Sequence, residues 1–142
     1  MNEIEQDWAR LALGISKGTK PEAISIAKNI HVAAFREGHR IEAIYGYADR
    51  GTEHSSGLAL DIMVPNKAAG DFISRWVWKN RERYRLRHLI WWQRIASVAR
   101  ESEGWRAMED RGGKTANHKD HPHVYVNPGK YRSSAAWAKG IR

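Results

Sequence analysis

The sequence predicts a small α+β domain, with a central antiparallel sheet of about four strands and flanking helices. A chain of 142 residues with 42% hydrophobic residues has the size of one domain with a real core. Helical and strand-like segments follow one another in the order ααββαβ(α)β, and neighbouring strands in such an order pair antiparallel. We divide the chain into a domain at 1–126, whose residues 1–20 form an N-terminal helical segment, and a basic tail at 127–142.

Three helices are expected. In residues 3–15 apolar side chains recur at helical spacing, and Gly18 follows as a stop signal. Pro21 opens the second helix, because a proline in the first turn lacks only an N–H group that has no partner there. Gly38 ends this helix. The third helix is expected over residues 67–84.

Four segments have the composition of strands, with β-branched and aromatic residues bounded by turn signals. Pro65 stops the second segment, and the third is expected to be a central strand. A helix-like segment at 96–103 and a glycine-rich loop at 110–114 separate the third segment from the fourth. The four predicted strands are residues 41–47, 59–64, 89–95 and 122–126.

Composition limits the functions that the chain can have. The absence of cysteine excludes disulfides and zinc held by thiolates. A formal charge of +8 favours polyanions, among them nucleic acid, an anionic cell wall and a membrane surface. No stretch approaches ~20 apolar residues, so no insertion into a membrane is expected. The acidic start of the chain lacks the features of a secretion signal, and we expect synthesis in the cytoplasm without a cleaved signal.

A first group of chemically useful residues runs from His54 to Asp61. A helix would hold these two side chains about 10 Å apart along its axis, but a turn followed by a strand would bring them together, and Gly57 permits such a turn. Asp61 stands in an otherwise apolar strand, where a carboxylate is costly unless a metal or another group pairs with it. A loop histidine beside an outward-facing aspartate explains the same residues equally well.

A second group contains His118, Asp120, His121 and His123. Residues two apart in a strand share a face, so His121 and His123 are expected on one side of the sheet. The alternative is a solvated histidine-rich loop, which the β-branched strand that follows makes less favourable. Imidazole and carboxylate without thiolate form the ligand set of a hydrolytic Zn²⁺ centre, which needs three protein ligands and an open position.

These motifs resemble a known family. His-x₆-Asp with an inner Gly-x-Ala, followed by Asp-His-x-His-Val, resembles the LAS-type zinc peptidases, which comprise lysostaphin-like enzymes, D-alanyl-D-alanine metallopeptidases and hedgehog N-terminal domains. Trp91-x-Gln93-Arg94-Ile95 and the segments at 104–105, 108–112 and 117–124 resemble an actinobacterial and mycobacteriophage branch of D-Ala-D-Ala carboxypeptidase-like domains. The resemblance covers roughly residues 22–126 and implies a zinc cleft on the sheet.

The resemblance also implies roles for single residues. His54, Asp61 and His123 would be the ligands of one Zn²⁺ ion. Asp120 would be the general base, and His121 would stabilise the tetrahedral intermediate or orient the water.

Further residues are expected on the substrate side. The family has an arginine before its first ligand, for which Arg50 is the nearest match at a different offset, and His118 matches an accessory histidine. Aromatic side chains are expected to line the groove, namely Tyr47, Trp91, Trp92 and Trp105. The chain departs from the family at Leu58 and Pro122, and neither change removes a ligand.

The predicted function is that of a zinc-dependent peptidase that hydrolyses the stem peptide or cross-link of bacterial peptidoglycan. We expect a monomer that serves as a phage endolysin or wall-remodelling module, reaching the wall by holin-type release or on a virion. One alternative is a catalytically silent, metal-bearing wall-binding module, which would need neither Asp120 nor His121. The other is a basic nucleic-acid-binding protein, for which the chain has no recognisable signature, and no nucleic-acid partner is expected.

Overall fold

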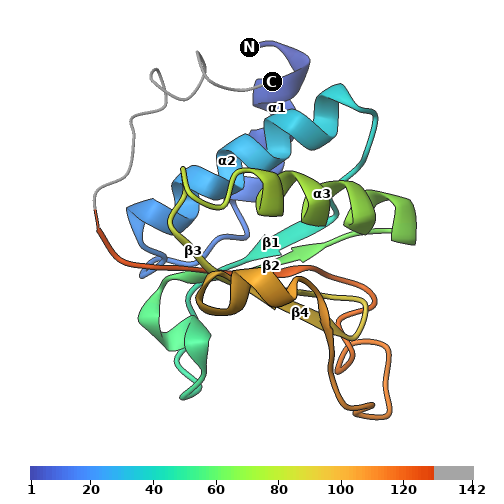
Figure 1. The fold of residues 1–142 in the computed structure, drawn as a ribbon. Helices are drawn as coiled ribbons and strands as arrows, with labels where there is room; N and C mark the ends of the chain where they lie inside the picture. Colours follow the sequence, from blue (N-terminus) through green and yellow to red (C-terminus); the bar gives the residue numbers. More distant parts are fainter. Residues whose placement is uncertain (130–142) are drawn as a thin grey trace.

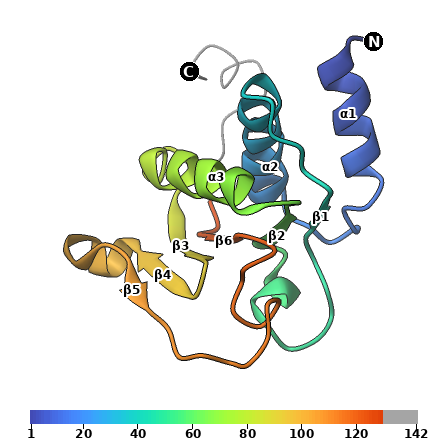
Figure 2. The same ribbon diagram turned by 90° about the vertical axis from the view of Figure 1, so that its right-hand side faces the viewer.

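A six-stranded antiparallel sheet organises the chain, and the α-helices cover one of its faces (Figure 1). The computed structural model describes residues 1–129. Figure 2 shows the helices above the sheet and the long segment that leads from β5 to β6 below it. The α+β class and the antiparallel pairing agree with the prediction, whereas the sheet has six strands instead of about four. The helices are α1 (Glu3–Ala12), α2 (Pro21–Arg36) and α3 (Lys67–Lys79).

The strands follow the order β1-β2-β6-β3-β4-β5 across the sheet. Strand β6 therefore lies between β2 and β3, although it comes after all the other described strands in the sequence. This position brings the two histidine-containing groups of the sequence side by side. The strands are β1 (Ala43–Tyr45), β2 (Ala59–Met63), β3 (Leu86–Trp91), β4 (Arg94–Ser97), β5 (Arg106–Ala107) and β6 (His123–Val126).

Local signals explain where the helices begin and end. Pro21 stands in the first turn of α2, as predicted. The side chain of Asn66 accepts a backbone N–H at the start of α3, which satisfies a donor without a partner in the helix. The predicted helix at 67–84 ends earlier, at Lys79. The side-chain amide of Asn80 donates to a carbonyl of the last helical turn, which supplies a partner for that end of the helix.

The prediction of one continuous strand at 89–95 is wrong, because the structure has two antiparallel strands joined by a tight turn there. Strands β3 and β4 are joined by Trp92 and Gln93, whose φ angles are 54° and 60°. Two left-handed residues are what a type I′ turn requires, and Asn and Gly are the residues that usually signal it. The predicted helix-like segment at 96–103 starts as the end of β4 and continues as the 3₁₀-helix η2 (Val98–Glu103). Strand β5 has no counterpart in the prediction.

The two faces of the sheet have different compositions. Successive residues of a strand point to opposite faces. In β2 and β6, Leu60, Ile62 and Val124 are fully buried in the hydrophobic core that includes α2 and α3. Their neighbours in the two strands, Asp61 and His123, lie on the other face, which we call the metal face.

The described part of the chain contains no helix with the length and apolarity needed to cross a membrane. Of the predicted tail at 127–142, only residues 127–129 belong to the described structure.

Candidate metal centre

Strand pairing places the second and third predicted metal ligands directly opposite each other. Asp61 of β2 is the register partner of His123 of β6. Nδ1 of His123 lies 3.0 Å from Oδ1 of Asp61. Both side chains are on the metal face, and His123 is buried. The cross-strand register therefore explains how residues far apart in the sequence come into contact.

A short helix supplies the remaining predicted ligand. His54 lies in the 3₁₀-helix η1 (Glu53–Ser56), which ends at Gly57 with a φ of 77°. A Cβ atom at Gly57 would lie 2.3 Å from the carbonyl oxygen of Gly18, so the turn needs glycine for its backbone angle and for space. Nε2 of His54 reaches to 3.1 Å from Oδ2 of Asp61. The prediction that a turn brings His54 to Asp61 is confirmed.

The described residues include groups that could hold a metal ion. One ligand atom each from His54, Asp61 and His123 lie within 4.8 Å of one another. Glu53, His88 and His123 form a second such group, which shares His123 with the first. Two imidazoles and one carboxylate suit zinc, and also suit other first-row transition metals.

The contacts among His54, Asp61 and His123 require a proton or a cation between these side chains. The carbonyl of Gly46 can only accept, so Nδ1 of His54, 2.8 Å away, carries the hydrogen. Nε2 of a neutral His54 then presents a lone pair to Asp61. The ring nitrogens of His123 likewise face two carboxylates, Asp61 and Glu53. Lone pairs at these distances repel each other unless a proton or a cation lies between them.

The same contacts shift the acid–base properties of these side chains. Burial raises the pKa of Glu53, but hydrogen bonds from His123 and His88 outweigh it and lower the pKa to about 2. Burial lowers the pKa of His123, but its contacts with Asp61 and Glu53 raise it to about 9. The pKa of Asp61 is lowered, because hydrogen bonds from His123 and His54 outweigh its burial. Without a metal, the proton that His123 retains offsets part of the charge of the two carboxylates that it contacts.

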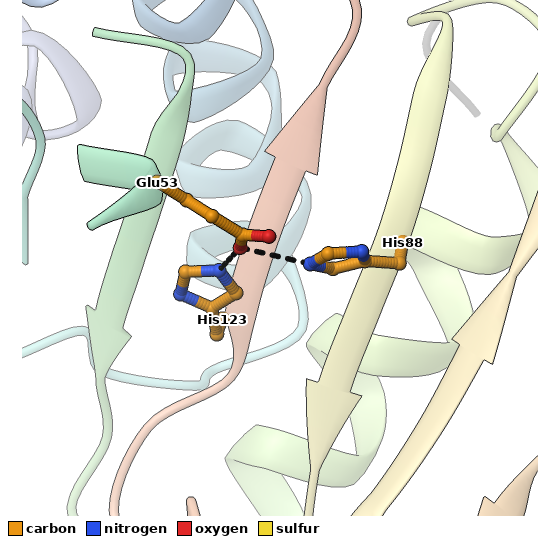
Figure 3. Close-up of side chains that lie close together, drawn as sticks. All are labelled: Glu53, His88 and His123. Carbon is orange, nitrogen blue, oxygen red and sulfur yellow. Dashed lines mark hydrogen bonds and ion pairs between the residues drawn. The ribbon is translucent and has the colours of Figure 1, made fainter. Parts of the chain in front are cut away.

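Glu53 and His88 are site residues that the sequence prediction missed. Figure 3 shows the Glu53 carboxylate between the rings of His88 and His123. A single oxygen, Oε1, lies 2.7 Å from Nε2 of His123 and 2.9 Å from Nε2 of His88. A carboxylate that accepts the outer N–H of a histidine fixes the tautomer and leaves the inner nitrogen for a metal. The position of Glu53 beside His54 was a usable signal, whereas His88 has no motif around it.

Asp120 and His121 form a pair beside the ligands. Nδ1 of His121 lies 2.6 Å from Oδ1 of Asp120, and Nε2 of His121 lies 3.6 Å from Oδ1 of Asp61. The other oxygen of Asp120 accepts a hydrogen bond from Thr115 at 2.7 Å. Burial raises the pKa of Asp120, but the bonds from His121 and Thr115 lower it. One ring nitrogen of His121 is thus directed toward the group of possible ligands, and Asp120 binds the other.

A pocket of about 500 Å³ opens in front of the metal group. Its wall includes the side chains of Arg50, Arg111 and His118. Arg111 and His118 belong to the segment between β5 and β6. Asn117 accepts a hydrogen bond from the backbone of Arg111 and donates one to Asp110, which fixes this segment. Burial and the nearby charge of other histidines lower the pKa of His118 to about 4.

The predicted substrate residues do not all reach this pocket. Arg50 and His118 line it, and Arg111 is an addition. Tyr47 lines a neighbouring cavity together with Arg50 and Asp61. Trp91 lies on the opposite face of the sheet. His88 and Ile90 of β3 share the metal face, and strand alternation therefore directs Trp91 away from it.

Comparison with known proteins gives a family and one distant relative. The family described as VldE, C-terminal domain, matches residues 15–119, a range that contains His54 and Asp61 and ends just before Asp120. A protein of Arthroderma benhamiae named "Uncharacterized secreted protein" is 31% identical over 90 residues, covering 47% of this chain. The chain spans 37% of the length of that relative. No solved structure matches the chain.

Proposed function

This chain belongs to the family described as VldE, C-terminal domain, and we propose that it is a zinc-dependent peptidase that hydrolyses peptide bonds of bacterial peptidoglycan. The observation that carries the proposal is the convergence of His54, Asp61 and His123 in front of an open pocket. The family's description names no reaction, so the proposal rests on the chemistry of these side chains and on the LAS-type motifs in the sequence.

The donor set fits a catalytic zinc ion. His54 would offer Nε2, His123 would offer Nδ1, and Asp61 would offer its carboxylate, because Gly46 and Glu53 occupy the outer nitrogens of the two imidazoles. Three protein ligands and one open position are typical of hydrolytic zinc sites. A zinc ion held there would polarise the scissile carbonyl and lower the pKa of water.

In this proposal His121 transfers the proton and Asp120 positions His121. Nε2 of His121 lies 3.6 Å from Oδ1 of Asp61, on the side of the proposed ligands, while Nδ1 is held by Asp120. His121 would therefore take a proton from the attacking water at Nε2 and return it to the leaving amine. Asp120, predicted from the sequence as the base, would act through His121 by fixing its ring and stabilising its charged form.

Two arginines give the pocket an affinity for carboxylates. Arg50 and Arg111 both line it, and guanidinium groups bind carboxylates in a bidentate manner. His118 adds an imidazole whose low pKa keeps it neutral at pH 7, so that it can donate or accept a hydrogen bond. The stem peptides of peptidoglycan carry free carboxylates, and the net charge of +8 would favour an anionic wall.

The central experiment measures zinc and hydrolysis together. The full chain is loaded with zinc, the metal content is measured by mass spectrometry, and purified peptidoglycan is assayed for new free amines. We expect one zinc per chain, and we expect Asp61→Asn to lose both zinc and amine release. His39→Ala is the matched control, because His39 contacts Phe72 and lies outside the metal group. Zinc without amine release would favour the silent wall-binding module instead.

A second experiment tests the division between His121 and Asp120. We expect His121→Ala and Asp120→Asn to keep zinc and to lower kcat by roughly 10²–10⁴-fold, the usual contribution of a general base. If Asp120→Asn lost zinc, Asp120 would be a ligand. If His121→Ala kept full activity while Asp120→Asn lost it, Asp120 would be the base itself.

A further inference from the structure

A second cavity, of about 290 Å³, lies on the helix-covered face of the sheet. We call it the tryptophan cavity, since Trp91, Trp92 and Trp105 all line it. It is separate from the metal pocket, although both use the β3–β4 hairpin. Ile90 and Ile95 face the metal pocket, while their neighbours Trp91 and Arg94 face the tryptophan cavity. One hairpin therefore builds a wall of both cavities.

Aromatic walls with a charged rim suit a sugar ring. The axial C–H groups of a pyranose form an apolar face that packs on an indole, and the hydroxyls around its edge need polar partners. Trp105 is 37% exposed and offers such a face. Lys67, Arg75 and Arg94 supply donors on the rim. The cavity is at the small end of the range for ligand pockets, which fits one sugar ring and not a bulky ligand.

A buried hydroxyl in this cavity lacks a partner. Ser74 lines the cavity and is 3% exposed, and its Oγ makes no hydrogen bond within the part of the chain that the structure describes. A buried hydroxyl without a partner is costly. A ligand with both a donor and an acceptor, such as the acetamido group of an N-acetylated amino sugar, would satisfy it.

The turn that carries Trp92 is strained. Trp92 and Gln93 both have positive φ, which is costly for residues other than glycine. The backbone N–H groups of these two residues donate to His118 and Asn117, at 2.9 and 2.8 Å. The same segment provides His118 to the metal pocket. Strain that the structure maintains in this way is found preferentially where a side chain must be held for function.

The charged residues on the rim of the cavity disfavour cationic ligands. Asp71 is the acidic residue of the cavity, and both Lys67 and the indole N–H of Trp91 bind its carboxylate. The ammonium groups of Lys67 and Lys119 lie 5.1 and 5.4 Å from the centre of the Trp92 ring. The cavity is therefore unfavourable for cationic ligands and favourable for neutral or anionic ones.

We propose that the tryptophan cavity binds an N-acetylated amino sugar of the peptidoglycan glycan strand, an inference that rests on the proposed function for its choice of polymer. The sugar would pack on Trp105, and its acetamido group would bind Ser74. A glycan held at one face of the β3–β4 hairpin would keep its attached peptide near the metal pocket at the other.

The test uses the full chain and the β-1,4-linked tetramer of N-acetylglucosamine, which contains no peptide. We expect saturable binding by calorimetry and shifts of the indole N–H signals of Trp92 and Trp105 in NMR spectra. Trp105→Ala should weaken binding by about tenfold or more. Tyr45→Ala is the control, because Tyr45 is an exposed aromatic residue outside this cavity.

Two further measurements distinguish a failure of the sugar site from a failure of the proposed peptidase function. His54→Ala should bind the tetramer unchanged, and Trp105→Ala should still cut a soluble stem peptide at the normal rate. Loss of peptide cutting with intact sugar binding would affect the proposed function alone. No tetramer binding, or equal binding by Trp105→Ala, would overturn the sugar site. Displacement of the tetramer from these tryptophans by single-stranded oligothymidylate at equal or lower concentration would assign the cavity to nucleic acid instead.

Discussion

The metal face and the helix-covered face of the sheet are built from the same strands but are stabilised in different ways. On the helix face, Leu60, Leu89 and Val124 belong to a hydrophobic core and need only close packing. On the metal face, the alternate residues Asp61 and His123 satisfy their polar groups through one another. Burial of apolar surface stabilises the first face without any ligand. The second face holds charges whose balance depends on protons or on a metal.

This difference separates the two roles that neighbouring residues can have. A change on the helix face should alter stability and leave metal affinity unchanged. A change on the metal face should alter metal affinity and the balance of buried charge. Four predictions test this separation, beginning with the largest expected effect.

The strongest test compares two adjacent residues of β6. His123→Ala should reduce zinc affinity by more than about 100-fold, a larger loss than that of an outer-shell partner, because it removes a proposed ligand. Val124→Ala should keep zinc affinity and lower the free energy of unfolding by about 1–3 kcal/mol through the cavity it leaves. Zinc titration and urea unfolding of both variants give the two quantities. Equal loss of zinc by both variants would show that the faces are not independent.

The convergence of His54, Asp61 and His123 could be predicted in large part from the sequence, for physical reasons. His54, Gly57 and Asp61 lie within eight residues, so a local turn was enough to relate them. His123 could be added because it stands in a strand with a recognisable pattern. The pairing of β2 with β6 is a long-range contact, and the residues within either strand do not specify it. The α+β class followed from the order of the segments, which is a coarser property.

The parts that could not be predicted share a dependence on tertiary contacts. Trp92 and Gln93 form a turn against their own preferences, held by Asn117 and His118, so local preferences predict one continuous strand where the structure has a hairpin. Trp91 was expected in the groove as an aromatic residue, and it lines the cavity on the helix-covered face instead. His88 became part of the site only through the neighbouring position of β3 beside β6.

The second prediction concerns the carboxylate behind a ligand. Glu53→Gln keeps the size of the side chain but weakens its hold on His123 and His88. Zinc affinity should fall by about 10–100-fold, the range for outer-shell partners of metal ligands. Competition with a fluorescent chelator measures this loss. Glu37→Gln, at an exposed position, is the control. An affinity that stays within twofold would mean that Glu53 does not orient His123.

The third prediction perturbs the helix face alone. A Cβ atom at Gly70 of α3 would lie 2.1 Å from the ring of Trp91, so Gly70→Ala must displace the indole. We expect a loss of about 1–3 kcal/mol in the free energy of unfolding, typical of overpacking, with zinc affinity unchanged. Gly113→Ala has no atom within 4 Å of the added carbon and should have little effect. Reduced zinc affinity in Gly70→Ala would show that the hairpin transmits strain to the metal face.

The smallest effect we expect is a pH dependence that belongs to one face only. In the metal-free protein the pKa of His123 is raised from 6.5 to about 9, so its proton stabilises the fold fully below pH 6.5. This stabilisation is lost as the pH rises through 9. On the helix face, burial raises the pKa of Asp71 but bonds from Trp91 and Lys67 lower it, so the stabilisation that Asp71 contributes is lost only in acid.

After removal of metal by a chelator, Tm should therefore fall by a few degrees between pH 6.5 and 9, roughly as expected for a change on the order of 1 kcal/mol. Zinc would replace the proton on His123, so the zinc-loaded protein should not show this fall. A chelated protein whose Tm rises over that interval would mean that His123 is neutral in the fold, and that the two carboxylates are balanced elsewhere.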